Sequence, residues 1–177
     1  RPPSCCVPLL TSVCMVMRVA ITGGIACGKS LFSQTLRRLG AELLDADDVV
    51  HCLEAPGGEA VPALVHLFGA SVLGQDGGID RAVLGERVFS DPAALRRLNA
   101  AVHPLVRQIL QTWSAEPADR IRIAVIPLLF EAGWIDDWDV IICLVSSEAL
   151  QRERLMRSRG LTDEQARHLT IHGASRN

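Results

Sequence analysis

One short segment carries the clearest chemical signal in the sequence, the eight residues Gly23-Gly24-Ile25-Ala26-Cys27-Gly28-Lys29-Ser30. They satisfy the pattern G-x-x-x-x-G-K-[ST], in which the main-chain N–H groups of a glycine-rich loop surround phosphate oxygens. The Lys ammonium then reaches the outer phosphates, and the Ser hydroxyl ligates Mg²⁺. The pattern predicts Lys29 as a catalytic cation, Ser30 as a metal ligand, and an ATP-binding segment made of Gly23, Gly24, Ile25, Ala26, Cys27, Gly28, Lys29, Ser30 and Leu31.

The use of basic residues supports this interpretation. Of the 18 Lys and Arg residues, 17 are Arg, and the single Lys is Lys29. A chain that uses Arg almost everywhere keeps a Lys inside its glycine-rich loop. The position indicates a chemical role for this ammonium group rather than a solvated surface charge.

The single Lys also narrows the class of protein that such a phosphate-binding loop, or P-loop, indicates. The guanine-reading motif N-K-x-D is absent, because the only Lys lies in the loop itself. This argues against a GTPase, and 177 residues are few for a motor or a transporter ATPase. A kinase that acts on a small molecule is the class that remains.

The composition of the chain limits the partners that it is expected to have. A net charge of −2 and the absence of Tyr argue against a nucleic-acid-binding surface. The six cysteines show no C-x-x-C pair and are typical of reduced thiols in a cytoplasmic protein. The apolar stretch before Met17 is shorter than the roughly 20 residues that a membrane span needs. We expect no nucleic-acid or membrane partner, and a monomer or weak oligomer.

The elements that must position these residues follow an alternating pattern. Apolar runs at 19–22, 42–45, 121–126 and 139–145 predict four buried strands. Helices are expected from Lys29 to Gly40 and over 61–73, followed by a turn at 74–78. This alternation predicts an α/β fold, the three-layer P-loop NTPase architecture with a parallel sheet.

The remaining helices are predicted from their termini and faces. In the first helix, Leu31, Phe32, Leu36 and Leu39 are expected on one face. Ser90-Asp91-Pro92 predicts the start of another helix, with Leu95, Leu98 and Val102 on one face and Pro104 as a break or kink. Ser147 is expected to cap an Arg-rich helix, and Thr162-x-x-Gln165 has the spacing of a capping box for the last one.

Several segments beyond the loop resemble dephospho-coenzyme A kinases in order and spacing. They are Leu44-Asp45-Ala46-Asp47 with His51, then His103-Pro104-Leu105-Val106-Arg107, then Pro127-Leu128-Leu129-Phe130-Glu131. Gly77 to Arg81 and Val88-Phe89 agree more weakly. The resemblance covers about residues 17–168. It implies an enzyme that uses ATP and Mg²⁺ to phosphorylate the ribose 3′-hydroxyl of dephospho-coenzyme A, the last step of coenzyme A biosynthesis.

The resemblance also implies roles for single residues. Asp47 matches the family's general base, whereas the residues alone leave it equally a helix cap or a surface acid. Asp45, His51, His103, Arg107 and Glu131 are implied on the acceptor side. From the residues alone, His103 could instead be a packed side chain, and Glu131 a metal-positioning or surface group.

An Arg-rich segment near 147–168 resembles the mobile lid of such kinases. Gln151 and Arg154 match a family Q-x-x-R pattern, so Arg154 is predicted to be catalytic by stabilising charge on the transferred phosphoryl group. The next expected Arg falls on Ser158, between Arg157 and Arg159. A solvated charged face is the alternative for Arg152, Arg157 and Arg159.

The two ends depart from the family pattern. Residues 1–16 are interpreted as a non-native or disordered extension before a kinase domain of residues 17–177. After His168 the family's Arg and Gln positions hold Leu169 and Gly173. We therefore expect a C-terminal truncation that removes the last strand and final helix and leaves an unpaired edge at 140–144. A kinase for another small metabolite or nucleotide, and an inactive nucleotide-binding fragment, remain alternatives.

Overall fold

A four-stranded parallel sheet forms the centre of the protein. The computed structural model describes residues 17–89 and 91–174, so the predicted extension at 1–16 lies outside the described residues. The strands are β1 (Val19–Gly23), β2 (Glu42–Asp45), β3 (Arg122–Val125) and β4 (Val140–Leu144), in the order β2-β3-β1-β4. All three pairings are parallel. The predicted strands are therefore confirmed to within about a residue at each end.

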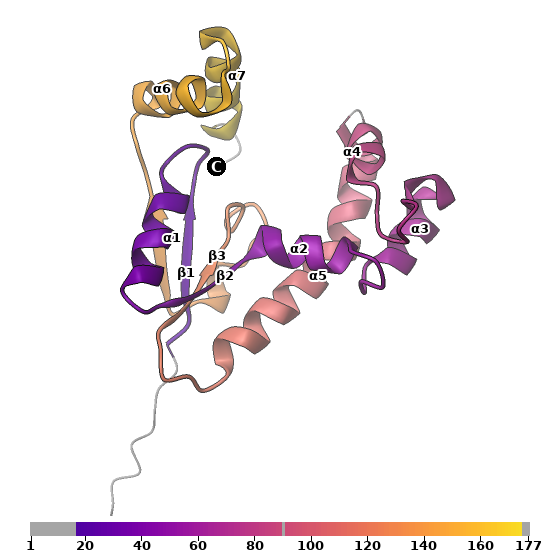
Figure 1. The fold of residues 1–177 in the computed structure, drawn as a ribbon, viewed down its shortest axis with the longest axis horizontal. Helices are drawn as coiled ribbons and strands as arrows, with labels where there is room; N and C mark the ends of the chain where they lie inside the picture. Colours follow the sequence, from indigo (N-terminus) through magenta and orange to yellow (C-terminus); the bar gives the residue numbers. More distant parts are fainter. Residues whose placement is uncertain (1–16, 90, 175–177) are drawn as a thin grey trace, which may run out of the picture.

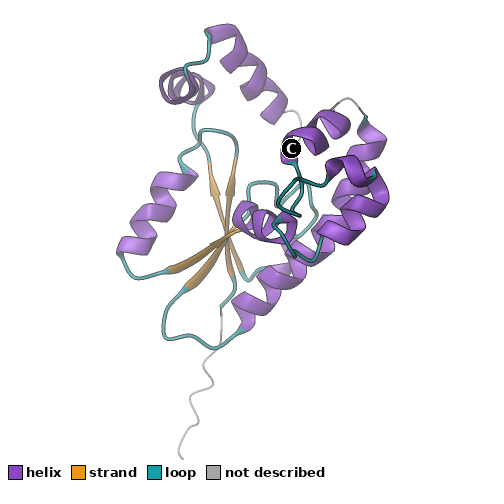
Figure 2. Ribbon diagram, turned by 45° about the vertical axis from the view of Figure 1, so that its right-hand side comes forward, coloured by secondary structure: helices purple, strands orange, loops and turns teal. Residues whose placement is uncertain are grey.

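Helices cover both faces of the sheet, which gives three layers (Figure 2). Because side chains alternate along a strand, Val19 and Ile21 of β1 face one layer and Ala20 faces the other. The first layer is α1 (Lys29–Arg38), which packs Phe32 and Leu36 on the sheet. The α/β P-loop architecture predicted from the sequence is confirmed.

The second layer contains α2 (Ala46–Glu54) and the long helix α5 (Pro92–Ala115). Buried residues of α5 recur at Val102, Val106 and Leu110, which is helical spacing for one face. Leu110 is fully buried, and burial of such a side chain contributes about 1.5–3 kcal/mol. Asp91 caps α5, with its carboxylate accepting from the N–H of Ala93 at 2.8 Å.

A helical arm projects from α2 and the start of α5 (Figure 1). It consists of α3 (Val61–Phe68), the short 3₁₀ helix η1 (Ala70–Val72) and α4 (Arg81–Phe89). The helix expected over 61–73 is shorter than predicted, because Gly69 adopts a positive φ of 81° and ends it. The carboxylate of Asp80 accepts from the N–H groups of Ala82 and Val83 and so caps α4.

The last two helices, α6 (Glu148–Arg159) and α7 (Asp163–Ala174), lie beyond the carboxyl ends of the strands (Figure 1). Ser147 caps α6 as predicted, accepting from the N–H of Leu150 at 3.4 Å. The capping box is also confirmed: Thr162 N–H donates to Gln165 Oε1 at 2.9 Å, and Gln165 N–H donates to Thr162 Oγ1 at 3.3 Å.

Parts of the predicted apolar helix faces are exposed, and one helix continues through a predicted break. Leu31 and Leu39 are 69% and 78% exposed, because only the i, i+4 pair Phe32 and Leu36 points at the sheet. Leu95 is likewise exposed, in the first turn of α5. Of the two outcomes predicted for Pro104, a break or a kink, the break is wrong, because α5 continues from Pro92 to Ala115. Pro104 and Ala100 are both exposed, so the carbonyl that loses its N–H partner remains accessible to water.

Strand β4 is an edge of the sheet among the described residues, as predicted for 140–144. Its Val140 and Cys143 are exposed. Cross-strand pairing on its other side joins it to β1 over its full length, from Val19↔Val140 to Gly23↔Leu144. β4 therefore holds the loop after β1 close to the start of the connection to α6.

Candidate active site

The glycine-rich loop joins β1 to α1 at the carboxyl edge of the sheet. Gly23, Ala26 and Gly28 all have positive φ, at 146°, 54° and 101°. Such alternation curls the main chain so that successive N–H groups converge, which creates a concavity for an anion. The first turn of α1 adds its unpaired N–H groups and the positive end of the helix dipole. Ile25 is half-buried in this loop and Leu31 lies on the exposed face of α1.

The ammonium of Lys29 points back into the loop. Nζ donates to the carbonyl oxygens of Gly23 at 2.5 Å and Gly24 at 2.8 Å. Partial burial lowers the pKa of this amine, and the nearby groups Cys27, Asp47 and Asp45 act in the opposite direction. The carboxylates at the end of β2 and the start of α2 therefore favour the charged form of the ammonium in the phosphate-binding loop.

Strand register places the acidic pair at the same edge. Asp45, at the end of β2, pairs with Val125 of β3, which in turn pairs with Ile21 of β1. Only one strand, β3, therefore separates the glycine-rich loop after β1 from the acidic pair after β2. Asp45 Oδ1 accepts from the N–H of Asp47 at 3.0 Å, so Asp45 caps α2 and leaves Asp47 exposed in its first turn. Burial raises the pKa of Asp45.

A polar cluster extends along α2 from Asp47. His51 follows one turn later and Glu54 two turns later, so all three share one helix face. Arg81 of α4 contacts both ring nitrogens of His51, and its Nε lies 3.0 Å from the buried carboxylate of Glu54. Burial raises the pKa of Glu54. Sequence reasoning did not assign Arg81 to the site, although the cap at Asp80 marks the helix that presents it.

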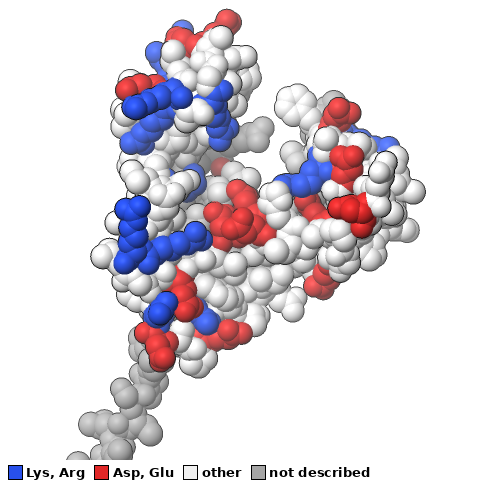
Figure 3. Space-filling model, viewed as in Figure 1, with Lys and Arg blue, Asp and Glu red and all other residues white. Residues whose placement is uncertain are grey.

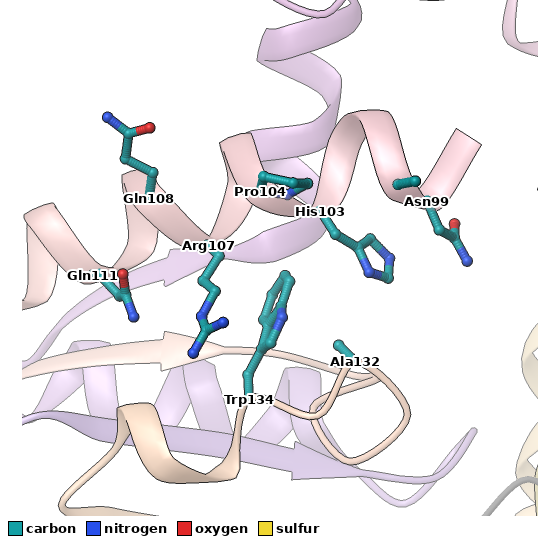
Figure 4. A pocket seen from close by; sticks show the side chains of 9 residues that line it. Asn99, His103, Pro104, Arg107, Gln108, Gln111, Ala132 and Trp134 are labelled. Carbon is teal, nitrogen blue, oxygen red and sulfur yellow. The ribbon is translucent and has the colours of Figure 1, made fainter. Parts of the chain in front are cut away.

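His103 and Arg107 lie on a flank of α5 beside the β3–β4 connection (Figure 4). The ring of His103 meets that of Trp134 edge to face, with centroids 5.4 Å apart. Burial lowers the pKa of His103. Arg107 Nε and Nη2 donate to Asp137 Oδ2 and Oδ1, each at 2.6 Å. The two α5 side chains therefore hold this connection, and they line a pocket of about 440 Å³ with Asn99, Ala100, Pro104, Gln108, Gln111, Ala132 and Trp134.

Glu131 does not end the third strand as expected. β3 stops at Val125, and Glu131 lies exposed in the turn that follows. Pro127 redirects the chain there, and the carbonyl of Pro127 accepts from the hydroxyl of Thr22 at 3.3 Å. Glu131 therefore belongs to the turn after β3 and not to the strand.

Helix α6 contacts the glycine-rich loop directly. Arg154 Nη1 donates to the carbonyl oxygen of Ala26 at 2.9 Å, and Gln151 Nε2 lies 2.8 Å from Cys27 Sγ. Arg152 instead pairs with Asp163 of α7, at 3.1 Å. Figure 3 shows basic side chains on the α6–α7 unit above a hollow, and acidic side chains gathered near the start of α2 below it.

The oxygen groups near the loop fit a magnesium ion bound through phosphates. The exposed hydroxyl of Ser30 lies in the first turn of α1, and the carboxylates of Asp45 and Asp47 lie across the edge. Within residues 17–89 and 91–174, no three His, Cys, Asp or Glu side chains cluster as a metal site. A single protein hydroxyl suits Mg²⁺, which keeps waters and binds substrate phosphates. None of the described helices is both long and apolar enough to cross a bilayer.

The sheet order, the loop after β1 and the acidic pair after β2 define a P-loop kinase. Residues 17–177 match the family model described as dephospho-CoA kinase. The chain belongs to the dephospho-CoA kinase family and is an enzyme of the transferase class. The family match continues beyond His168, where the residue-by-residue resemblance ends.

Individual relatives agree with the family match. The chain is 42% identical over 153 residues to the dephospho-CoA kinase of Streptomyces avermitilis, covering 86% of this chain and 75% of the relative. It is 39% identical over 156 residues to that of Geobacillus kaustophilus, covering 86% and 78%. A crystal structure from Thermus thermophilus matches with a TM-score of 0.72 at 32% identity, covering 88% of this chain and 79% of that one. The Campylobacter jejuni dephospho-CoA kinase matches at 0.56 and 25% identity, with the same coverage.

Proposed function

We propose that this chain transfers the γ-phosphoryl group of ATP to the ribose 3′-hydroxyl of dephospho-CoA, which yields CoA and ADP. The observation that carries the proposal is the strand register, which places the loop that holds Lys29 and the acidic pair that includes Asp47 at the carboxyl edge of the sheet, one strand apart. It brings a triphosphate-binding cation and an exposed carboxylate to one site, which in-line phosphoryl transfer to an alcohol requires.

The loop and α6 supply the ATP side of the site. Main-chain N–H groups of Gly23 to Leu31 surround the phosphates, and Lys29 exchanges its carbonyl partners for the β- and γ-phosphate oxygens. Arg154, now on the Ala26 carbonyl, is close enough to the loop to meet the charge that spreads over the transferred group. Mg²⁺, when bound, neutralises the phosphate charge, with Ser30 as its protein ligand.

Asp47 acts as the general base. Its carboxylate orients the acceptor hydroxyl and accepts the proton late in the transfer. Asp45 holds Asp47 in place through the cap of α2. His51 and Arg81 continue the same polar face, and Arg81 is a cation suited to the acceptor's diphosphate.

The loop after β3 completes the acceptor side. Glu131 is exposed in the turn after β3, from which it can position the acceptor or the metal. His103 and Arg107 support this loop through Trp134 and Asp137 and present its pocket to the acceptor. We also propose that the enzyme works in the cytoplasm as a monomer or weak oligomer, without nucleic acid or a membrane, in keeping with the free thiols of Cys27, Cys52 and Cys143.

The Asp47→Asn variant tests the central assignment. ADP release is measured with dephospho-CoA as acceptor, and ATP affinity is measured by calorimetry. Removal of the base is expected to lower kcat by about 10²- to 10⁴-fold, with little change in ATP affinity. The matched control is Asp48→Asn, an exposed neighbour in α2, which should keep normal turnover. An Asp47→Asn enzyme with wild-type kcat would refute the base assignment.

A panel of acceptors tests the substrate. Dephospho-CoA, adenosine, a nucleoside monophosphate and pantetheine are compared as acceptors, with and without Mg²⁺. We expect transfer to dephospho-CoA alone, and only with the metal. Preference for another acceptor would assign the chain to a different small-molecule kinase activity, and ATP binding without transfer to any acceptor would identify a nucleotide-binding fragment.

A further inference from the structure

Helix α6 contacts the phosphate-binding loop through two side chains, and only one of them carries charge. Gln151 and Arg154 are three residues apart, so they lie on one face of α6. Gln151 Nε2 contacts Cys27 Sγ at 2.8 Å, and Arg154 Nη1 contacts the Ala26 carbonyl at 2.9 Å. The neutral contact and the charged contact thus fall on adjacent residues of the loop.

The two α6 side chains also lie close to the glycines of the loop. A Cβ added to Gly24 would lie 3.5 Å from Gln151 Nε2 and 3.4 Å from Cys27 Sγ. A Cβ added to Gly28 would lie 3.4 Å from Arg154 Nη1. Such distances are ordinary van der Waals contacts, so the ends of Gln151 and Arg154 lie directly against the glycines of the loop.

The two contacts must behave differently during catalysis. Arg154 has to leave the Ala26 carbonyl to reach the phosphoryl group, because a guanidinium pairs more strongly with phosphate than with a neutral carbonyl. Gln151 meets a thiol that is not part of the phosphate-binding main chain, so this contact can persist while Arg154 exchanges partners. A persistent second contact keeps α6 from moving away during that exchange.

We infer that Gln151 is a positioning residue, which holds α6 on the Cys27 side chain so that Arg154 can reach the transferred phosphoryl group. The inference rests on the proposed function of Arg154. Gln151 itself touches neither substrate nor the reacting atoms. Its removal therefore weakens catalysis through Arg154 and leaves the main-chain phosphate contacts of the loop intact.

The first test separates turnover from nucleotide binding. Gln151→Met keeps the length of the side chain and removes its N–H donor, and Glu153→Gln, on the exposed face of α6, is the matched control. We expect kcat to fall about 3- to 10-fold in Gln151→Met, with the ATP dissociation constant within about twofold of wild type. In a Cys27→Ala background the same change should alter kcat by less than about twofold. Equal kcat in Gln151→Met and Glu153→Gln, or additive losses with Cys27→Ala, would overturn the inference.

The second test does not depend on the acceptor. Alkylation of Cys27 by iodoacetamide is followed by peptide mass analysis, with the exposed Cys52 of α2 as internal reference. Gln151→Ala uncovers the Cys27 thiol, so its alkylation should be at least about threefold faster while that of Cys52 is unchanged. An unchanged Cys27 rate would show that Gln151 does not cover the thiol. A wild-type chain that fails to phosphorylate dephospho-CoA would refute the proposed function, and the alkylation result would still decide this contact.

Discussion

Arg107 of α5 donates two hydrogen bonds of 2.6 Å to the carboxylate of Asp137, which lies 30 residues later in the sequence. Asp137 is 8% exposed, so this guanidinium pairs with a nearly buried carboxylate. The pair ties α5 to the segment that leads into β4. Arg107, expected from the sequence to bind substrate, thus has a partner within the protein itself.

The Asp137→Asn substitution should destabilise the fold at neutral pH. The hydrogen bonds from Arg107 hold the pKa of Asp137 below its usual range. A depressed folded-state pKa gives stability that is present above the unfolded pKa of about 3.9 and lost as pH falls through the folded value. We expect a midpoint of thermal unfolding several degrees lower at pH 7, and a difference from wild type that shrinks steadily below pH 4. Asp136→Asn, at the exposed neighbour, is the control for both measurements.

Two substitutions of Asp45 should distinguish its role as the cap of α2 from the role of its negative charge. Asn can cap a helix as Asp does, whereas Ala cannot. Asp45→Ala is expected to cost about 1 kcal/mol in the free energy of unfolding and to lower kcat, because Asp47 follows in the first turn of α2. Asp45→Asn should retain both properties to a large extent. Denaturant unfolding and the ADP-release assay measure the two effects, and a strong loss of kcat in Asp45→Asn would point instead to direct substrate contact.

Replacement of two glycines by Ala should change the stability of the fold in opposite directions. A Cβ on Gly23 would lie 2.4 Å from the carbonyl oxygen of Leu144 in β4, and its φ of 146° disfavours a side chain. Gly23→Ala should therefore destabilise by more than about 1 kcal/mol. Gly85 lies in α4 with nothing near its Cβ position, so Gly85→Ala should stabilise by about 0.5–1 kcal/mol. Urea unfolding curves of the two variants check this sign difference.

His103 should make stability fall on mild acidification. Partial burial lowers the pKa of its imidazole, whose ring meets that of Trp134 edge to face. The folded state therefore binds fewer protons than the unfolded state just below pH 6.5, so this stability is present above about pH 6.5 and declines as pH falls through the folded pKa. Between pH 7.5 and 5, wild type should lose more unfolding free energy than His103→Gln. Parallel losses in the two proteins would contradict the expected titration.

The sequence predicted the strands and the loop well because both are local signals. Buried parallel strands appear as short apolar runs, and the loop has a fixed glycine and lysine spacing. Helix α2 was missed because Asp45 both ends β2 and caps the helix, so no turn residue marks the boundary. Helix α5 continues through Pro104 because the surroundings of that residue are open to water. This exposure cannot be predicted from the residue type alone.

The residues of the candidate site also divide into those that local sequence signals predict and those that they do not. Lys29, Asp45 and Asp47 were predictable because they follow strands whose carboxyl ends share an edge. The partners of Arg107, His51 and Gln151 were not, since Asp137, Arg81 and Cys27 come from other elements and no spacing rule connects them. Long-range pairs of this kind arise from packing of whole elements.

The ammonium of Lys29 is the only side-chain amine in the sequence, and partial burial makes it less basic than an exposed lysine. A lysine-selective acylating reagent therefore meets one internal target, at the place where a triphosphate would rest. Labelling of that amine, read by mass, would act as a gauge of nucleotide occupancy without any engineered tag.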